Sequence, residues 1–275
     1  MDIKTHDNSD LNSLYIINYT IYETPDAGQF KLHSHDSYEM MIFFCGDAEY
    51  VSEGSIYPLG KNDLVIARPH EMHKVHHLSN KRYKRCVLGI SNEFFDKYNC
   101  CEYKDFFSRH SSGTYNMIKG DKVIESGILD LFNKIKMYSN DFKDIYQPVI
   151  SAIIIEILYI LNTKEDIYEV PSQNTLIRNT IRYINEHFCE KLNLSNIARD
   201  NFVSKYYLCR VFKDKTGYTI TSYVNHKRLQ YVRELCNDGM GISNASVEAG
   251  FSNYSAFYKA CMKETSLPPK DMVGK

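Results

Sequence analysis

The sequence predicts an α+β protein, with an N-terminal β-barrel, a helical segment and then an all-α domain. Residues 14–90 hold short apolar and aromatic runs, with turn residues every eight to ten positions. This texture is typical of a small antiparallel barrel. From residue 124 onwards, apolar residues recur mostly at helical spacing. The length of 275 residues also favours two domains.

The predicted barrel begins with strand-like runs at residues 14–22, rich in Ile and Tyr, and 39–44. Gly, Asn, Asp and Pro residues mark turns near positions 46, 54, 60–63 and 69. A capped helical pattern over residues 91–98 follows the barrel.

A histidine-rich run lies inside the predicted barrel. Residues 33–39 read His-Ser-His-Asp-Ser-Tyr-Glu, and a further histidine follows at position 73. The histidines at 33 and 35 would project from one strand face, joined by Glu39 if the strand is unbroken. Such a set could hold a divalent metal, but a metal-free polar pocket or a structural role is the preferred interpretation, and no cofactor is predicted. The candidate pocket residues are His33, His35, Tyr38, Glu39, Arg68 and His73.

Two helices are predicted after residue 115. Apolar residues step by three and four over residues 124–138, and they form a wide stripe over residues 150–161. Asn140 and Asp141 are expected to separate the two helices. The wide stripe must be buried, either against the barrel or against a second copy of the chain.

The predicted C-terminal domain contains two similar helical units. Its first helix is expected to be capped by Ser172. Residues 194–200 and 204–217 predict a helix, a short turn and a second helix, and residues 242–263 repeat this pattern. Gly250 is expected to take a positive φ in the second turn. Residues 219–236 predict one long helix that joins the two units rigidly.

The second helix of each unit has the character of a DNA-reading helix. Each opens at a small polar residue, Ser204 or Asn253, that can act as N-cap. Leu208, Val211 and Phe212 share one face of the first helix, which turns its basic and aromatic residues outward. Exposed Arg and Lys on a helix can contact guanine edges and phosphates in the major groove. We predict base contacts by Tyr206, Cys209, Arg210, Ser255 and Lys259, and phosphate contacts by Ser204, Lys205, Lys213, Asn253 and Lys263.

Charge is divided unequally along the chain. Residues 172–275 carry 15 Lys and Arg against 9 Asp and Glu, whereas residues 1–171 carry 18 against 25. A basic end on an acidic body supports a nucleic-acid-binding C-terminal domain.

Cysteine usage and hydropathy bear on the compartment. The eight Cys show no C-x-x-C pairing, and no signal-like segment precedes them, so we expect reduced thiols in the cytoplasm. The longest apolar run, residues 148–161, is too short to span a bilayer, and no membrane association is predicted.

Residues 192–272 resemble the DNA-binding domain of the AraC/XylS family of bacterial transcription regulators. The residues 33–39 also resemble the metal-binding motif of the cupin barrel that serves as the sensor domain of many members. Ser266 departs from the family pattern, which has Gly at this place. The matching residues are Leu208, Arg210, Phe212, Lys213 and Gly217 in the first unit, Tyr223, Asn225, Arg228 and Glu234 in the linking helix, and Gly250, Phe251, Ser255, Phe257 and Pro269 in the second.

The resemblance implies a transcription regulator and not an enzyme. Its partners would be double-stranded DNA, a small effector such as a sugar or another polar metabolite, and RNA polymerase if it is an activator. The alternative is a metal-dependent cupin enzyme with a DNA-binding tail. The implied domains are a cupin-like barrel at 1–115, a helical dimerisation segment at 116–165, a linker at 166–173 and a double helix-turn-helix domain at 174–275. A homodimer is expected through Ile124, Ile128, Leu131, Ile135, Ile150, Ile154, Ile157 and Leu161.

Overall fold

A computed structural model describes residues 4–8, 14–25, 32–110, 113–141, 147–164, 172–173 and 175–273. The chain forms two compact units, Met1–Ser172 and Gln173–Lys275. Most of the linker predicted at 166–173 lies outside the described residues. The four-part division of the chain stays a prediction.

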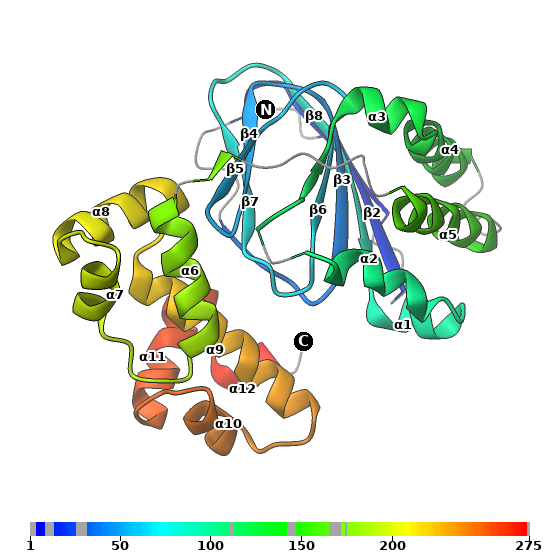
Figure 1. The fold of residues 1–275 in the computed structure, drawn as a ribbon. Coiled ribbons are helices and arrows are strands. Elements are labelled where there is room, and N and C mark those ends of the chain that lie inside the picture. The colour runs from blue at the N-terminus through cyan, green and yellow to red at the C-terminus, as the bar shows by residue number, and fades with distance from the viewer. Residues whose placement is uncertain are drawn as a thin grey trace. The chain divides into compact units, whose positions relative to one another are not determined.

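The first unit contains two antiparallel sheets (Figure 1). The larger has the strand order β1-β2-β8-β3-β6-β9, and the smaller has the order β10-β5-β4-β7. Strand β9 pairs with β6 although it follows the predicted barrel end at residue 115. The strands of the larger sheet are β1 Lys4–Asn8, β2 Tyr15–Tyr22, β8 Tyr83–Ile90, β3 Tyr38–Cys45, β6 Leu64–Ala67 and β9 Met117–Ile118, and those of the smaller are β10 Ser172–Gln173, β5 Ser55–Pro58, β4 Ala48–Ser52 and β7 His73–His77.

The larger sheet has an apolar core on each face. Alternate residues of a strand point to opposite faces, so Met40 and Ile42 of β3 pack toward the helices. Met41 and Phe43 of the same strand pack instead with Tyr50 and Tyr57 of the smaller sheet. A residue on β3 therefore faces either the helical layer or the space between the sheets.

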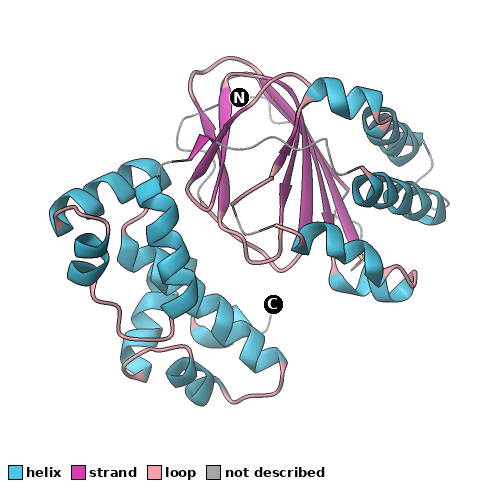
Figure 2. Cartoon of the chain, in the orientation of Figure 1, coloured by secondary structure: helices cyan, strands magenta, loops and turns pink. Residues whose placement is uncertain are grey.

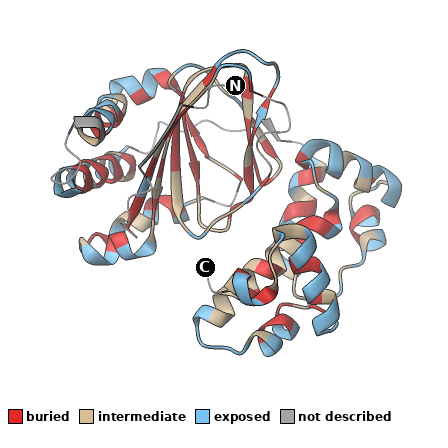
Figure 3. Cartoon of the chain, turned by 180° about the vertical axis from the view of Figure 1, so that it is seen from behind, coloured by how far each residue is buried: buried red, intermediate tan, exposed pale blue. Residues whose placement is uncertain are grey.

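The helices of the first unit cover the face of the larger sheet that points away from β4, β5 and β7 (Figure 1). Their apolar sides are buried, and the sides turned outward are exposed (Figure 3). The elements are α1 Asn92–Lys97, the 3-10 turn η1 Cys101–Lys104, α2 Asp105–Ser108, α3 Gly120–Glu125, α4 Ile128–Asp141 and α5 Gln147–Thr163.

The predicted dimer contact through the apolar stripe is wrong for seven of its eight residues. These seven side chains are buried in one core with the larger sheet, so they cannot form the surface of a dimer. Only Ile124, which is 54% exposed, remains on the surface. Helical periodicity shows that a face is buried, but not which partner covers it. The buried residues are Ile128, Leu131, Ile135, Ile150, Ile154, Ile157 and Leu161.

The helix boundaries in this segment also differ from the prediction. Residues 124–138 form two helices, because Gly127 takes a φ of +82° and ends α3 before α4 begins. Asn140 and Asp141 are the last two residues of α4, and α5 begins at Gln147, so the two predicted helices are separated after the expected position. The additional break, between α3 and α4, is made by Gly127, because glycine leaves the helical conformation at little cost.

Within residues 175–273 the second unit consists of helices and loops (Figure 2). The long linking helix is confirmed as α9, whose N-cap Thr219 accepts a hydrogen bond from the Ser222 amide. Ser172 does not cap the first helix, because α6 starts at Thr175 and Ser172 lies in β10. The helices are α6 Thr175–His187, α7 Leu194–Asp200, α8 Lys205–Thr216, α9 Ile220–Asn237, α10 Ile242–Glu248, α11 Tyr254–Thr265 and α12 Pro269–Val273.

No helix in the described ranges combines the length and the apolar character that crossing a membrane requires. All eight cysteines lie in those ranges as free thiols.

Candidate DNA-binding surface and sensor site

The first helix-turn-helix unit is formed by α7 and α8. The Asn193 side chain caps α7, and the Ser204 hydroxyl caps α8 by accepting a hydrogen bond from the Tyr207 amide at 3.2 Å. Gly217 ends α8 in the left-handed region, with a φ of 82°. Leu208 and Phe212 are fully buried, so the opposite face of α8 points to solvent.

That outward face presents the base-reading residues predicted from the sequence. Tyr206 is 78% exposed. Arg210 is also exposed, and Cys209 between them is partly exposed. The guanidinium of Arg210 lies 5.5 Å from the centre of the Tyr207 ring, which supports it from the side. Lys205 and Lys213, the predicted phosphate contacts, are exposed on the same helix.

The second helix-turn-helix unit, formed by α10 and α11, repeats this arrangement. The Asn253 side chain caps α11 by accepting a hydrogen bond from the Ala256 amide at 2.8 Å. Ser255 and Lys259 are exposed, as the sequence predicts for base-reading residues. Lys263 is exposed and lies 3.4 Å from the Glu264 carboxylate. Both second helices therefore offer a polar and basic face.

The turn that precedes α7 connects the two helix-turn-helix units. Arg228 of α9 donates hydrogen bonds to the carbonyl oxygens of Phe188 and Glu190, at 2.7 and 2.8 Å. Gly250, in the turn of the second unit, takes the predicted positive φ, +88°. A Cβ on Gly250 would lie 2.1 Å from the carbonyl oxygen of Cys189, between the two residues that Arg228 holds. The backbones of the two units thus approach too closely for any side chain at position 250.

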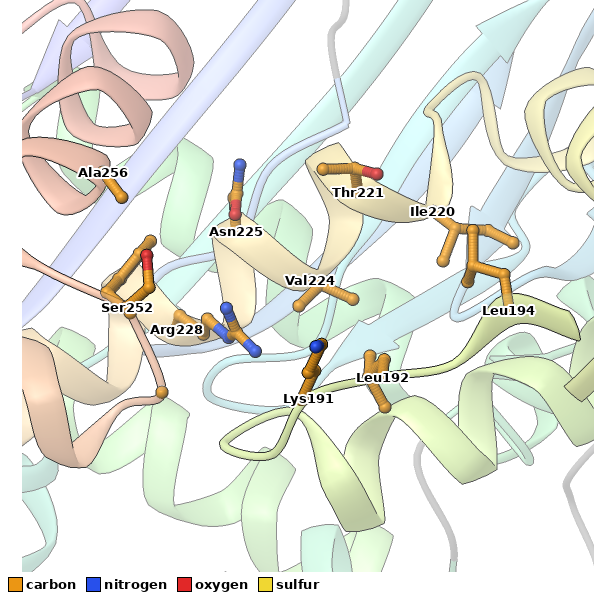
Figure 4. Close-up of a pocket in the computed structure, with 12 residues that line it drawn as sticks. Lys191, Leu192, Leu194, Ile220, Thr221, Val224, Asn225, Arg228, Ser252 and Ala256 are labelled. Atoms are coloured by element: carbon orange, nitrogen blue, oxygen red, sulfur yellow. The ribbon is translucent and has the colours of Figure 1, made fainter. Parts of the chain in front are cut away.

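A cleft of about 700 Å³ lies beside this contact (Figure 4). It was not predicted, because its walls come from three segments that are far apart in the sequence. The side chains of Lys191 and Arg228 give it positive charge, and Thr221 and Asn225 of α9 add polar groups. The remaining lining residues are Leu192, Leu194, Ile220, Val224, Gly250, Phe251, Ser252 and Ala256.

Ser266, which stands where the family pattern has Gly, adopts an unfavourable backbone conformation. Ser266 ends α11 with a φ of 59°, in the left-handed region where Gly217 ends α8. We expect Ser266→Gly to raise the free energy of unfolding by roughly 0.5–1 kcal/mol, because Gly adopts this conformation without a Cβ clash. Urea unfolding of the full chain, followed by far-UV circular dichroism, measures this change.

Ser243→Gly is the matched control for Ser266→Gly. Ser243 is exposed within α10, where Gly is a poorer helix former by about 0.5 kcal/mol. The control is therefore expected to destabilise the protein. A loss of stability in Ser266→Gly as well would refute the conformational explanation.

In the N-terminal unit, Met1–Ser172, four of the six predicted pocket residues come together. His33 and His73 pair through their backbones, with N–O distances of 3.0 and 2.9 Å. His35 Nε2 lies 3.0 Å from Glu39 Oε2, and His73 Nε2 lies 3.7 Å from Glu39 Oε1. The strand does not run unbroken from 33 to 39 as the prediction assumed, because a bend at Asp36–Ser37 precedes β3. That bend still returns Glu39 to the imidazole of His35.

The electrostatics of this cluster favour an ionised carboxylate beside a neutral imidazole. Burial disfavours the charged form of Glu39, but the hydrogen bond with His35 and nearby positive charge, including Arg85, outweigh it and lower the pKa to about 2. Burial lowers the pKa of His73 to about 4 in spite of Glu39. The pKa of His35 is raised, because its contacts with Glu39 and Ser37 outweigh its burial.

Tyr38 and Arg68 do not join the cluster, and their prediction as pocket residues is wrong. Tyr38 alternates with Glu39 on β3 and therefore points to the helical layer, with its ring 4.5 Å from that of Phe107. Arg68 donates to the carbonyl oxygens of Phe107 and Thr114 and pairs with Glu71 at 3.1 Å. Both side chains have structural roles.

Two residues that the sequence did not single out, Arg85 and Tyr50, are brought near the cluster of Glu39 and His73 by the fold. Arg85 lies opposite Phe43 in the β3–β8 pairing, so it faces the space between the sheets. The ring of Tyr50 lies 6.0 Å from that of His73. Alternation along residues 83–87 signals which face Arg85 takes, but only the strand pairing shows that this face is the one with Glu39.

Comparison with known proteins places both units in one family. A family model described as an AraC-like ligand binding domain matches residues 19–106, and one described as a helix-turn-helix domain matches residues 197–274. The HTH-type transcriptional activator RhaS of Escherichia coli O1:K1 / APEC is 21% identical over 247 residues, which cover 88% of this chain and 87% of RhaS. The uncharacterized HTH-type transcriptional regulator YdiP of Escherichia coli strain K12 is 22% identical, over 87% of this chain and 79% of YdiP.

The solved structures that match this chain include unsaturated-fatty-acid-bound ToxT from Vibrio cholerae strain SCE256. It is 15% identical, covers 95% of each chain and has a TM-score of 0.36. The two matched family models follow one another in the order of the two units, and the second covers both helix-turn-helix units. The chain therefore belongs to the AraC/XylS family of DNA-binding transcription regulators, with an N-terminal ligand-binding domain.

Proposed function

We propose that this regulator reads a specific DNA sequence through α8 and α11 and that a small effector bound in the first unit controls this reading. The observation that carries the proposal is the pair of N-capped helices α8 and α11, each with an exposed polar face. Both contact α9, since Phe212 of α8 packs against Tyr223 and Glu264 of α11 accepts a hydrogen bond from Ser222. Two such helices held in one rigid unit can enter successive major grooves on one side of a duplex.

The contacts divide into base reading and phosphate binding. Tyr206, Cys209 and Arg210 of α8 lie on the exposed face and are proposed to reach base edges, with Ser255 and Lys259 as their counterparts on α11. Arg210 is the strongest base reader, because a guanidinium can donate two parallel hydrogen bonds to one guanine. The remaining polar residues of the two helices are proposed to bind phosphates, namely Ser204, Lys205, Lys213, Asn253 and Lys263.

We expect Arg210→Ala to weaken binding to the selected DNA site by about 1–3 kcal/mol and to relax the preference at one base pair. A site selected from random DNA by the wild-type protein provides the duplex, and fluorescence anisotropy at fixed salt gives the Kd. Arg182→Ala is the control, because it removes the same charge from an exposed position on α6, outside both recognition helices. An equal loss on the selected site and on random DNA would show that Arg210 contacts only the backbone.

The effector is proposed to act in the cytoplasm by favouring one arrangement of the regulator over another. A ligand shifts such an equilibrium only when its affinities for the two states differ. A homodimer also stays a proposal, in which the stripe residues buried in the core of the first unit do not form the contact. Activation through RNA polymerase, which the name of RhaS suggests, is the proposed outcome of DNA binding.

A further inference from the structure

We propose that the second helix-turn-helix unit reads the methyl groups of thymine through Tyr258 and Met262 of α11. Its half of the DNA site would then be selected for A·T base pairs by apolar contact, in addition to the polar contacts of Ser255 and Lys259. This preference rests on the proposed function, because α11 must lie in a major groove to exert it.

The helices α8 and α11 correspond residue by residue. Each is 12 residues long, and each begins after an N-cap whose side chain accepts a hydrogen bond from an amide three residues on, Ser204 in α8 and Asn253 in α11. Each also ends at a residue in the left-handed conformation, Gly217 or Ser266. Every outward residue of α8 therefore has a defined counterpart on α11.

Three outward places differ in character between the two helices. The first, fifth and ninth residues of α8 are Lys205, Cys209 and Lys213. The same places on α11 hold Tyr254, Tyr258 and Met262, each at least 40% exposed. Residues four apart lie on one side of a helix, so α11 presents an apolar stripe where α8 presents two ammonium groups and a thiol.

The apolar stripe lies beside the polar residues proposed to read bases. Ser255, Lys259 and Met262 follow one another at helical spacing, so the thioether of Met262 shares their face. Tyr258 directly precedes Lys259 and is exposed next to it, in the place that Cys209 takes on α8. A major groove that receives Lys259 therefore also receives Tyr258 and Met262.

Tyr254 has a different role from the other two apolar residues. Its ring centre lies 5.5 Å from that of Phe257, in an edge-on contact, and Phe257 is fully buried. The ring of Tyr254 therefore leans on the core of the second helix-turn-helix unit and helps to fix the start of α11. Tyr258 and Met262 remain as the apolar groups that can reach a base.

The chemistry of the major groove selects the target of these side chains. The base edges there carry hydrogen-bond donors and acceptors, and the C5-methyl of thymine is the apolar group among them. An aromatic ring or a thioether gains free energy by covering that methyl group, whereas it would desolvate a polar edge without pairing it. Burial of one methyl group corresponds to about a fourfold change in Kd.

Uracil substitution in the selected DNA site tests the methyl contact with the full-length protein. Each thymine of the duplex selected by the wild type is replaced in turn by deoxyuridine, which exchanges only the C5-methyl for hydrogen. The base pair at which Arg210→Ala relaxes the preference marks the half that α8 reads. In the other half we expect thymines whose replacement raises the Kd about fourfold each, measured by fluorescence anisotropy at fixed salt.

Variants of the two side chains assign each methyl group to its partner. Tyr258→Ala is expected to weaken binding to the thymine duplex at least threefold and to abolish the effect of uracil at one position, because that methyl group has then lost its contact. Tyr258→Phe keeps the ring and is expected to keep the effect. Met262→Ala is expected to abolish the effect at a neighbouring position.

Val247→Ala is the matched control. Val247 is an exposed apolar residue of the same helix-turn-helix unit, but it lies on α10 and outside the recognition helix. Its substitution is expected to change neither the Kd nor the effect of uracil, and circular dichroism verifies that all the variants are folded.

The outcomes separate this inference from the proposed function. If the wild type binds its selected site but tolerates uracil at every position, the methyl contact is refuted and sequence-specific binding stands. An undiminished effect of uracil in both Tyr258→Ala and Met262→Ala would also overturn the assignment. If no preferred duplex can be selected at all, the proposed function itself is refuted, and the methyl contact with it.

Discussion

Gly250→Ala is expected to lower the free energy of unfolding of the C-terminal unit, Gln173–Lys275, by about 3 kcal/mol or more. The new Cβ would lie 2.1 Å from the carbonyl oxygen and 2.6 Å from the carbonyl carbon of Cys189. The variant also forces a residue with a Cβ into a φ of +88°, which costs about 1–2 kcal/mol by itself. Relief of the clash requires a backbone shift, which adds about 1–3 kcal/mol. Urea unfolding of the full chain, followed by far-UV circular dichroism, measures the loss.

The carbonyl of Cys189 cannot move away easily. Arg228 holds the carbonyl oxygens of both neighbouring residues, Phe188 and Glu190, and its guanidinium lies 5.6 Å from the Phe251 ring centre. A shift at Cys189 would therefore disturb the linking helix and the turn of the second unit together. We expect Gly250→Ala to weaken DNA binding as well, because it alters the relation between α8 and α11.

Gly239→Ala is the control for the steric part of this effect. Gly239 has a similar φ of +91°, but no atom lies within 4 Å of the position of its Cβ. This variant is expected to lose only the conformational part, about 1 kcal/mol. If Gly250→Ala and Gly239→Ala lose the same amount of stability, the contact with Cys189 does not hold the two helix-turn-helix units together.

The second unit could be predicted in detail because its signals are local. Ser204 and Asn253 cap their helices through hydrogen bonds to amides only three residues away, and positive φ at Gly217 and Gly250 follows from glycine at a helix end. Leu208 and Phe212 lie four residues apart and are both buried, so Arg210 between them falls on the exposed face of α8. The sequence contains no comparable sign of the cleft or of the approach of Gly250 to Cys189.

The first unit was less predictable because its features depend on distant pairings. The histidine run near Glu39 and the later His73 were recognisable in the sequence, but only the bridge between His33 and His73 shows how they come together. Arg68 was misassigned because its partner Glu71 and the carbonyl of Thr114 are visible only in the folded chain. The apolar stripe of α5 was misassigned because the sheet covers it, and periodicity cannot name the covering surface.

Glu71→Gln is expected to destabilise the first unit by about 3–5 kcal/mol. Glu71 is 1% exposed, and its carboxylate accepts hydrogen bonds from the Arg68 side chain and from the backbone amides of Arg68 and Gly113. It also accepts from the Asn116 side-chain amide at 2.8 Å. Gln leaves the nearly buried guanidinium of Arg68 without its counter-charge and turns an NH₂ donor toward groups that are themselves donors. The melting temperature and urea midpoint of the full chain measure this loss.

Glu49→Gln separates this buried network from an ordinary surface ion pair. Glu49 is partly exposed on β4, and its carboxylate lies 3.7 Å from His76. Such a pair contributes little, so the control is expected to change stability by no more than about 0.5 kcal/mol. Arg68→Ala should lose about as much stability as Glu71→Gln, and the double variant less than the sum of the two, because both substitutions break one pair. Additive losses would show that Glu71 acts mainly through Gly113 and Asn116, so that the 113–116 segment is held independently of Arg68.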